Sequence, residues 1–153
     1  MSGISQTMTT SFKVELLDGV HAFGSIYRSA DTFKIALLKS IVSGTYGATT
    51  INYSQVVANG DEVVAVGYTV GGGTLVVNPT PTAGNTGAAT AYVSFNNYTW
   101  NSAISSSGAL IYNSTQDGRS VALLSFGKII TSNLTFEVQF PTAAAGTAII
   151  QIQ

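Results

Sequence analysis

The chain has 153 residues, which fits a single domain, and no cysteine, which excludes disulfide bonds and thiolate metal sites. Only 8% of its residues are charged, compared with about 25% in typical soluble domains, and its formal net charge is -1. This weak charge argues against nucleic acid as a partner and favours self-association or docking onto another protein.

The N-terminal part of the chain combines a polar segment with one helix candidate. Residues 1–10 are small and polar without hydrophobic periodicity, which predicts a flexible or partner-ordered arm. Residues 11–23 place apolar side chains at helical spacing, with Ser11 as a candidate cap and Gly24 as a candidate end. Because Gly19 lies inside this stretch, a strand after Gly19 is the alternative. The apolar face of the predicted helix consists of Phe12, Leu16, Leu17, Val20 and Phe23.

The patterns that follow predict strands and turns. In residues 31–38, the large apolar side chains of Phe33, Ile35 and Leu37 stand at every second position, as in a strand with one apolar face. The dipeptide Asn59-Gly60 lies between two valine-rich runs, which predicts a hairpin turn. Residues 79–87 contain two prolines among small residues, which predicts a loop because proline does not fit a central strand.

The second half of the chain continues with β patterns. Residues 89–100 and 133–140 alternate apolar and polar side chains, and residues 146–153 resemble a closing strand. Residues 108–127 predict two strands joined at Asp117-Gly118, a dipeptide favoured in two-residue hairpin loops because both of its residues tolerate positive φ.

Both arms of this hairpin are apolar at consecutive positions. Residues 109–112 and 121–124 leave no polar face, so both faces of the hairpin need cover. The whole chain offers seven to nine short strands and one helix. It predicts a mainly β fold over residues 11–153, an antiparallel β-sandwich of jelly-roll or Greek-key type with one short N-terminal helix, or a barrel.

Candidate catalytic groups are few. His21 is the only histidine and lies between apolar neighbours, which favours a packed or surface side chain over a catalyst. Residues 71–73 are three glycines without the lysine and the helix of a phosphate-binding loop. Asp31 and Glu137 could form a glycosidase pair only if the fold brought them together. The sequence therefore predicts no enzyme, no metal site and no cofactor.

Aromatic side chains gather in residues 92–100. Tyr98 and Trp100 share one side of a regular strand, where they could stack on sugars. They could equally pack in the core or against another subunit, which is the more frequent role of aromatic residues in strands. Both interpretations stay open at the level of sequence.

Seven segments of the chain carry a resemblance to known proteins: SFKVELLDGVHAF (11–23), DTFKIALL (31–38), GYTVGGGTL (67–75), TWNSAISSSGALIYN (99–113), VALLSFGK (121–128), FPT (140–142) and the final AIIQIQ. Together they resemble a family of small structural proteins from tailed bacteriophages, most like the capsid cement or decoration proteins of short-tailed phages. The resemblance covers nearly the whole chain after residue 10, and its segments are strands and turns rather than catalytic signatures.

The resemblance implies a structural protein of the capsid surface, made in the bacterial host cytoplasm, that clamps neighbouring major capsid subunits without catalysis. A dimer or trimer, or a capsid subunit, would then cover the second face of the 108–127 hairpin. Residues 1–13 lack the apolar core of a signal peptide and no apolar run is long enough for a membrane helix, so no membrane is expected. The alternative function is a tail-tip or receptor-binding module that recognises host glycans. The expected partner interface consists of Phe12, Leu16, Leu17, Val20, Tyr98 and Trp100.

Overall fold

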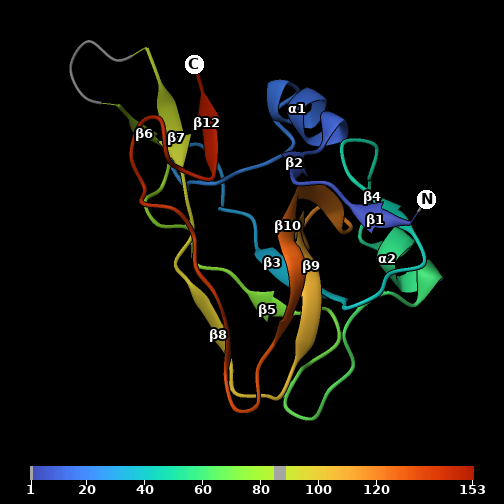
Figure 1. The fold of residues 1–153 in the computed structure, drawn as a ribbon. Helices are drawn as coiled ribbons and strands as arrows, with labels where there is room; N and C mark the ends of the chain where they lie inside the picture. The colour runs from blue at the N-terminus through green and yellow to red at the C-terminus, as the bar shows by residue number, and fades with distance from the viewer. Residues whose placement is uncertain (1, 85–88) are drawn as a thin grey trace.

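The computed structural model describes residues 2–84 and 89–153, so Met1 and residues 85–88, which include part of the predicted 79–87 loop, lie outside the described residues. The fold is mainly β, with mostly antiparallel sheets and two short helices in the described part of the chain (Figure 1). No helix among these residues is long and apolar enough to cross a membrane. The elements are β1 (Gly3–Ile4), β2 (Thr7–Met8), α1 (Thr10–Leu17), β3 (Phe33–Lys39), β4 (Thr45–Tyr46), α2 (Ser54–Asn59), β5 (Gly73–Thr74), β6 (Thr82–Ala83), β7 (Ala91–Val93), β8 (Tyr98–Trp100), β9 (Ser105–Asn113), β10 (Arg119–Thr131), β11 (Phe136–Val138) and β12 (Ile150–Ile152).

A five-stranded antiparallel sheet forms the centre of the molecule, in the order β2-β10-β9-β3-β5 (Figure 1). The predicted strand at residues 31–38 is confirmed as β3, and the predicted hairpin is confirmed as β9 and β10. The connection of the hairpin spans residues 114–118 and is longer than the predicted two-residue loop. Both Asp117 (φ +52°) and Gly118 (φ +78°) adopt the positive φ that the prediction required.

The two faces of the central sheet carry two separate clusters of buried side chains. On the first face, Ile35 of β3 is paired with Ile111 of β9. On the second face, Ala36 is paired with Leu110, because successive side chains of a strand point to opposite sides. Since both faces are buried, both demand apolar side chains, which accounts for the consecutive apolar positions of the hairpin arms.

Each face of the central sheet is covered by other parts of the same chain. The first face packs against α1 and the two small sheets β11-β8 and β12-β7-β6, with Phe12 and Trp100 in its cluster. The second face packs against β4 and α2, with Tyr46 and Val56 in its cluster. The chain itself therefore covers the hairpin face that the sequence analysis assigned to another copy or to a capsid subunit.

Helix α1 begins earlier than predicted. The Oγ1 atom of Thr9 accepts a hydrogen bond from the Phe12 N–H at 3.3 Å, so Thr9 rather than Ser11 caps the helix. Thr9 is buried, and its own N–H donates to the Val121 carbonyl of β10 at 3.0 Å. The start of α1 is thus fixed by contact with the central sheet.

Helix α1 also ends earlier than the predicted 11–23 helix. Its last residue is Leu17, because Gly19 adopts a left-handed φ of +71° and the Val20 N–H donates back to the Glu15 carbonyl at 2.9 Å. The following residues up to the start of β3 form neither helix nor strand, so the alternative strand after Gly19 is wrong as well.

The sequence predicts a flexible or partner-ordered arm over residues 1–10, and two short strands of this segment pair with other strands of the same chain. β1 pairs in parallel with β4, and β2 pairs with Ala122 and Leu123 of β10. The side chain of Ile4 packs against the cluster of the second face, and that of Met8 packs against the cluster of the first face. Backbone hydrogen bonds and these two apolar side chains together hold this segment against the rest of the chain.

The valine-rich segment before Asn59-Gly60 is a helix, so the predicted hairpin turn is wrong. Val56 of α2 is fully buried on the second face of the sheet. Gly60 ends α2 in the left-handed conformation (φ +63°), with its N–H turned back to the Val56 and Val57 carbonyls. A glycine that tolerates positive φ serves a helix end as well as a hairpin turn, which is why the same dipeptide misleads.

The predicted strand over residues 89–100 is divided into β7 and β8, which belong to different small sheets. The alternation predicted for residues 133–140 is confirmed in β11, where Phe136 and Val138 are buried and the residue between them is exposed. Leu134, predicted on the same side, lies before the strand and is exposed. The closing strand is confirmed as β12.

Candidate functional site

The six predicted interface residues do not share one surface. Phe12 and Trp100 are core residues of the first face, and Trp100 is only 4% exposed. Leu16 and Tyr98 are half-buried and pack against the same cluster. Val20 is half-buried and lies outside α1, whereas Leu17 is 89% exposed at the end of the helix. Of the six, Leu17 alone offers a fully exposed side chain to a partner.

Of the two interpretations of Tyr98 and Trp100 that the sequence leaves open, the structure favours packing over stacking on sugars. Their ring centroids lie 4.6 Å apart, and the Trp100 ring also contacts Tyr68 and Phe136. The Tyr98 ring covers Gly73 so closely that a Cβ atom there would lie 2.1 Å from it. The two rings fill the space between the central sheet and the β11-β8 sheet, so they belong to the core.

A buried polar network, which sequence reasoning missed, surrounds His21. His21 Nε2 lies 2.8 Å from Glu15 Oε2 of α1, and the other oxygen of Glu15 accepts from Arg119 Nη1 at 2.6 Å. Asn113 Nδ2, at the end of β9, lies 3.0 Å from His21 Nδ1 and 2.7 Å from Asp31 Oδ2. We call these residues the His21 network: Glu15, His21, Asp31, Asn113 and Arg119.

The hydrogen bonds of Asn113 define the protonation state of His21. Asn113 Oδ1 accepts the backbone N–H groups of Thr115 and Gln116, at 3.1 and 3.2 Å, which assigns the amide orientation. Its Nδ2 group must then donate to His21 Nδ1, so Nδ1 carries no proton and the proton of the neutral ring is on Nε2, which donates to Glu15. Both ring nitrogens are occupied within the chain, which leaves neither for a substrate proton.

Burial lowers the pKa of His21 below its ordinary value of 6.5, against the opposing effect of the Glu15 and Asp31 carboxylates. Burial alone would raise the pKa of Asp31. Hydrogen bonds from the Ala22 N–H, Asn113 and Gln116, together with the Arg28 charge, reverse this effect and lower the pKa. The network therefore holds a neutral imidazole beside ionised carboxylates and ties α1, the segment before β3 and the hairpin to one another.

We expect the free energy of unfolding to fall as the pH drops below about 6.5. The unfolded chain binds a proton on His21 at its ordinary pKa of 6.5, whereas the folded chain resists that proton because its pKa is lowered. Stability therefore rises with pH across this window, with a slope of at most about 1.4 kcal/mol per pH unit for one proton. Urea unfolding between pH 5 and 7 measures the slope.

The matched control for this pH dependence is His21→Gln, which removes the titrating ring. Between about pH 5 and 6.5 its free energy of unfolding should change less with pH than that of the parent, because carboxylates of ordinary pKa near 4 stay ionised there. An equal slope in the two proteins would contradict the role of His21.

Two further buried carboxylates, those of Asp61 and Glu62, tie loops beside the central sheet to one another. Asp61 accepts the N–H groups of Ser43 and Gly44 and the Tyr46 hydroxyl, at 2.7 to 2.8 Å. Burial opposes ionisation of Asp61, but these donors outweigh it and lower its pKa. Glu62 accepts the Tyr68 hydroxyl at 2.8 Å and the Gly71 N–H at 2.7 Å, and also bonds the Tyr53 hydroxyl. Burial, reinforced by Glu62, raises the pKa of Tyr53 and Tyr68.

The candidate glycosidase pair is not brought together. Asp31 belongs to the buried His21 network, whereas Glu137 lies exposed on β11 and bonds to Asn97, Thr99 and Gln139. Within residues 2–84 and 89–153, no group of three or more His, Asp or Glu side chains is placed to hold a metal ion.

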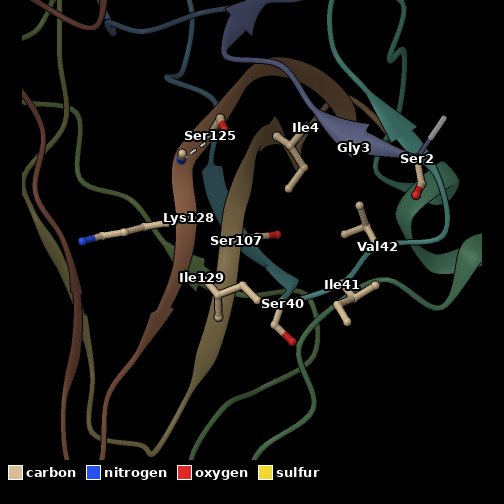
Figure 2. A pocket seen from close by; sticks show the side chains of 11 residues that line it. Ser2, Gly3, Ile4, Ser40, Ile41, Val42, Ser107, Ser125, Lys128 and Ile129 are labelled. Atoms are coloured by element: carbon tan, nitrogen blue, oxygen red, sulfur yellow. Dashed lines mark hydrogen bonds between the residues drawn. The ribbon is translucent and has the colours of Figure 1, made fainter.

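A groove of about 330 Å³ opens on the second face of the sheet (Figure 2). Its walls come from the N-terminal segment, from the residues after β3 and from a distorted part of β10. The register of β9 and β10 shifts between Ser125 and Ile130, so residues 126–129 bulge out of the ladder. The lining residues are Ser2, Gly3, Ile4, Ser40, Ile41, Val42, Ser107, Ser125, Gly127, Lys128 and Ile129.

The chemistry of the groove is that of a contact surface. Ile41 and Ile129 are exposed, and serine hydroxyls alternate with the aliphatic side chains. The one charged lining residue, Lys128, points its ammonium away from the other side chains (Figure 2). The groove therefore offers aliphatic side chains and serine hydroxyls and, among the residues that line it, a single charged group.

Comparisons with family models, with curated proteins and with solved structures found no match for this chain.

Proposed function

We propose that this chain is a non-catalytic structural protein of a virion, a capsid cement or decoration protein that docks on the shell of major capsid subunits. The observation that carries the proposal is a surface poor in ionised groups and rich in exposed apolar side chains. Such a surface is typical of a protein that meets other proteins by shape and apolar contact. The large apolar side chains left exposed are Val14, Leu17, Ile26, Tyr27, Ile41, Ile51, Val57, Val64, Val66, Val70, Val76, Ile129, Leu134 and Ile152.

The distribution of carboxylates strengthens this argument. Four of the seven acidic side chains are buried in the networks described above: Glu15, Asp31, Asp61 and Glu62. The other three are Asp18, Asp117 and Glu137, all exposed. The surface is therefore even poorer in negative charge than the composition indicates, and long-range electrostatics contribute little to recognition.

The buried ionisable groups support a structural role rather than a catalytic one. His21 has both nitrogens bonded within the chain, and Asp61 and Glu62 each accept several donors from neighbouring loops. We further infer that the small sheets act as the second layer of an irregular β-sandwich over the first face of the central sheet. A dimer or trimer stays a prediction, which sedimentation of the purified chain tests.

The test of this function uses shells assembled without this chain. We expect purified recombinant protein to bind such particles in hundreds of copies, counted by quantitative mass spectrometry. Because apolar contact is insensitive to ionic screening, occupancy should change less than about twofold between 0.1 and 1 M NaCl. A non-binding protein of similar size is the control for trapping.

Two outcomes would contradict the proposed function. Loss of the protein from particles at 1 M NaCl would mean that charge pairs hold it. A copy number of only three to twelve per virion would favour the tail over the shell, and with it the alternative of a tail-tip module.

A further inference from the structure

Three loops meet at the end of the molecule opposite α1 (Figure 1). They are the loop after residue 63, the connection from β8 to β9 and the connection from β10 to β11. The Val66 carbonyl accepts the Ser102 hydroxyl at 2.5 Å, and the Ser102 carbonyl accepts the Ser132 hydroxyl at 3.2 Å. Ile104 and Ser132 also exchange two backbone hydrogen bonds, at 2.8 and 3.2 Å. The three loops therefore form one continuous surface.

This surface presents large apolar side chains to solvent. Val66 is 96% exposed, Leu134 is 81% exposed and Val64 is 79% exposed. We call these three side chains the apolar tip. Isolated exposed apolar residues are ordinary, but these three stand on loops that hydrogen bonds join at one end of the molecule.

The apolar tip stands on a rigid base. In the same loop, the Tyr68 ring is buried against Trp100, and its hydroxyl accepts the Leu37 N–H at 2.9 Å and donates to Glu62 at 2.8 Å. A Cβ atom at Gly67, where φ is +84°, would lie 2.9 Å from the Asn101 carbonyl oxygen, so this loop lies directly on its neighbour. Little conformational entropy is lost when a surface held in this way is bound.

The apolar tip is free of ionised side chains along the chain. Residues 63–69, 99–107 and 129–136 contain no aspartate, glutamate, lysine, arginine or histidine. The ammonium of Lys39, at the nearby end of β3, donates to the Gly60 carbonyl at 2.6 Å. Burying this surface against a partner would therefore leave no unpaired charge in the three segments, and a charged partner surface would find no counter-ion there.

We infer that the apolar tip inserts into an uncharged apolar recess on the repeating subunit of the shell, an inference that rests on the proposed function. Burial of the three side chains removes on the order of 300 Å² from water, at roughly 60–120 Å² each. A stable contact between two free molecules buries about 800 Å² on each partner. The tip alone is thus too small to hold a second copy, but it suits one of several simultaneous contacts on a shell, where linked contacts reinforce each other.

The charge pattern also distinguishes a protein recess from a bilayer. Apolar loops that dock on membranes are typically flanked by lysine or arginine that bind anionic headgroups. The three segments of the tip lack such residues. Lys128 borders one segment and Lys39 lies nearby, which is short of the cluster of about four to eight basic residues that binds anionic headgroups. A protein recess of matching shape is therefore the occupant that this surface fits.

The test compares matched leucine substitutions at opposite ends of the molecule. Leu134→Gln changes the apolar tip, and Leu17→Gln makes the same change at an equally exposed site on α1. Both sites are exposed, so both variants should unfold at the same urea concentration as the parent. We expect Leu134→Gln, and likewise Val66→Gln, to weaken binding to shells that lack the chain by about tenfold or more, and by more than Leu17→Gln, which changes the competing interface predicted from the sequence. Ile26→Gln, at an 86% exposed position outside that interface, should leave binding unchanged within about twofold.

The outcomes distinguish failure of the apolar-tip inference from failure of the proposed function. If the parent binds shells and neither Leu134→Gln nor Val66→Gln weakens that binding, the inference about the apolar tip is wrong, while the proposed function stands. Weakening by Leu17→Gln instead would assign docking to the α1 end. No binding by the parent would overturn both.

Two further measurements test whether a second copy of the chain, or a lipid bilayer, binds the apolar tip instead of a shell subunit. We expect the parent chain to sediment with the same mass at all protein concentrations whether or not Leu134 is replaced. A concentration-dependent dimer that Leu134→Gln abolishes would assign the tip to a second copy. Co-sedimentation with phosphatidylcholine and phosphatidylglycerol vesicles that the same variant abolishes would assign it to a bilayer. Either result would overturn the inference.

Discussion

Gly72→Ala is expected to lower the free energy of unfolding by about 3–5 kcal/mol, one of the two largest effects predicted for a single substitution in this chain. A Cβ atom at Gly72 would lie 1.9 Å from the Ile35 carbonyl oxygen and 2.7 Å from the Ala36 Cα, both of them backbone atoms that rotation of a side chain cannot move. The residue also adopts φ +73°, which L side chains rarely adopt. The backbone of β3, or the loop that carries Gly72, would have to shift.

Gly19→Ala is the matched control for this prediction. Its φ of +71° is nearly the same, but a Cβ atom there would meet nothing within 4 Å. It should therefore show the backbone strain alone, about 1 kcal/mol. Urea unfolding followed by circular dichroism measures both variants, and equal losses would contradict the steric argument.

Asn113→Ala is expected to lower the free energy of unfolding by about 3–5 kcal/mol as well. The substitution removes the donors of His21 Nδ1 and Asp31 Oδ2 and the acceptor of two backbone N–H groups in the hairpin connection. Asn113 is fully buried, so water does not readily replace these partners. The Asn113 donor favours the neutral form of His21, so its removal should raise the pKa of His21 toward the ordinary value. The free energy of unfolding should then fall less between pH 7 and pH 5 than it does in the parent.

Asn133→Ala is the control for a change of asparagine at an exposed position, and it should alter the free energy of unfolding by less than about 0.5 kcal/mol. A loss below about 1 kcal/mol in Asn113→Ala would mean that the His21 network contributes little. The change in pH dependence, measured by urea unfolding at several pH values, is the second readout.

The parts of the fold that local pattern determines are the parts that the sequence predicts. The period of two predicts β3, and the Asp117-Gly118 turn between two apolar runs predicts β9 and β10. The consecutive apolar positions of the hairpin correctly indicate two covered faces. What covers those faces depends on contacts distant in sequence. α2 and β4 lie far from the hairpin along the chain, so no local pattern could assign them.

The errors arise where one local signal fits two structures. Asn59-Gly60 suits a helix end and a hairpin turn alike, and burial of Val56 against the sheet decided for the helix. In residues 11–23 the helical spacing continues past Gly19, but the left-handed conformation of that glycine ends the helix. Residues 2–10 look featureless because strands of two residues are too short to show a period.

The candidate site was less predictable than the fold. Exposure cannot be read from residue type, so the sequence predicts Phe12 and Trp100 as interface residues although both are buried, and it gives no sign that Val66 and Leu134 are exposed. The His21 network joins residues about 100 positions apart, such as Glu15 and Arg119. The one feature of the sequence that points to this network is the presence of Glu15, His21, Asp31 and Arg119 in a chain with few ionisable residues.

The bulge at residues 126–129 of β10 bears on how this protein avoids aggregation. β2 pairs with only Ala122 and Leu123, so the outer edge of the long strand β10 would otherwise be a template on which foreign strands could assemble into fibrils. A chain with so little net charge has weak mutual repulsion to prevent this. The bulge interrupts the regular spacing of N–H and C=O groups along that edge, so a foreign strand could pair with only part of it.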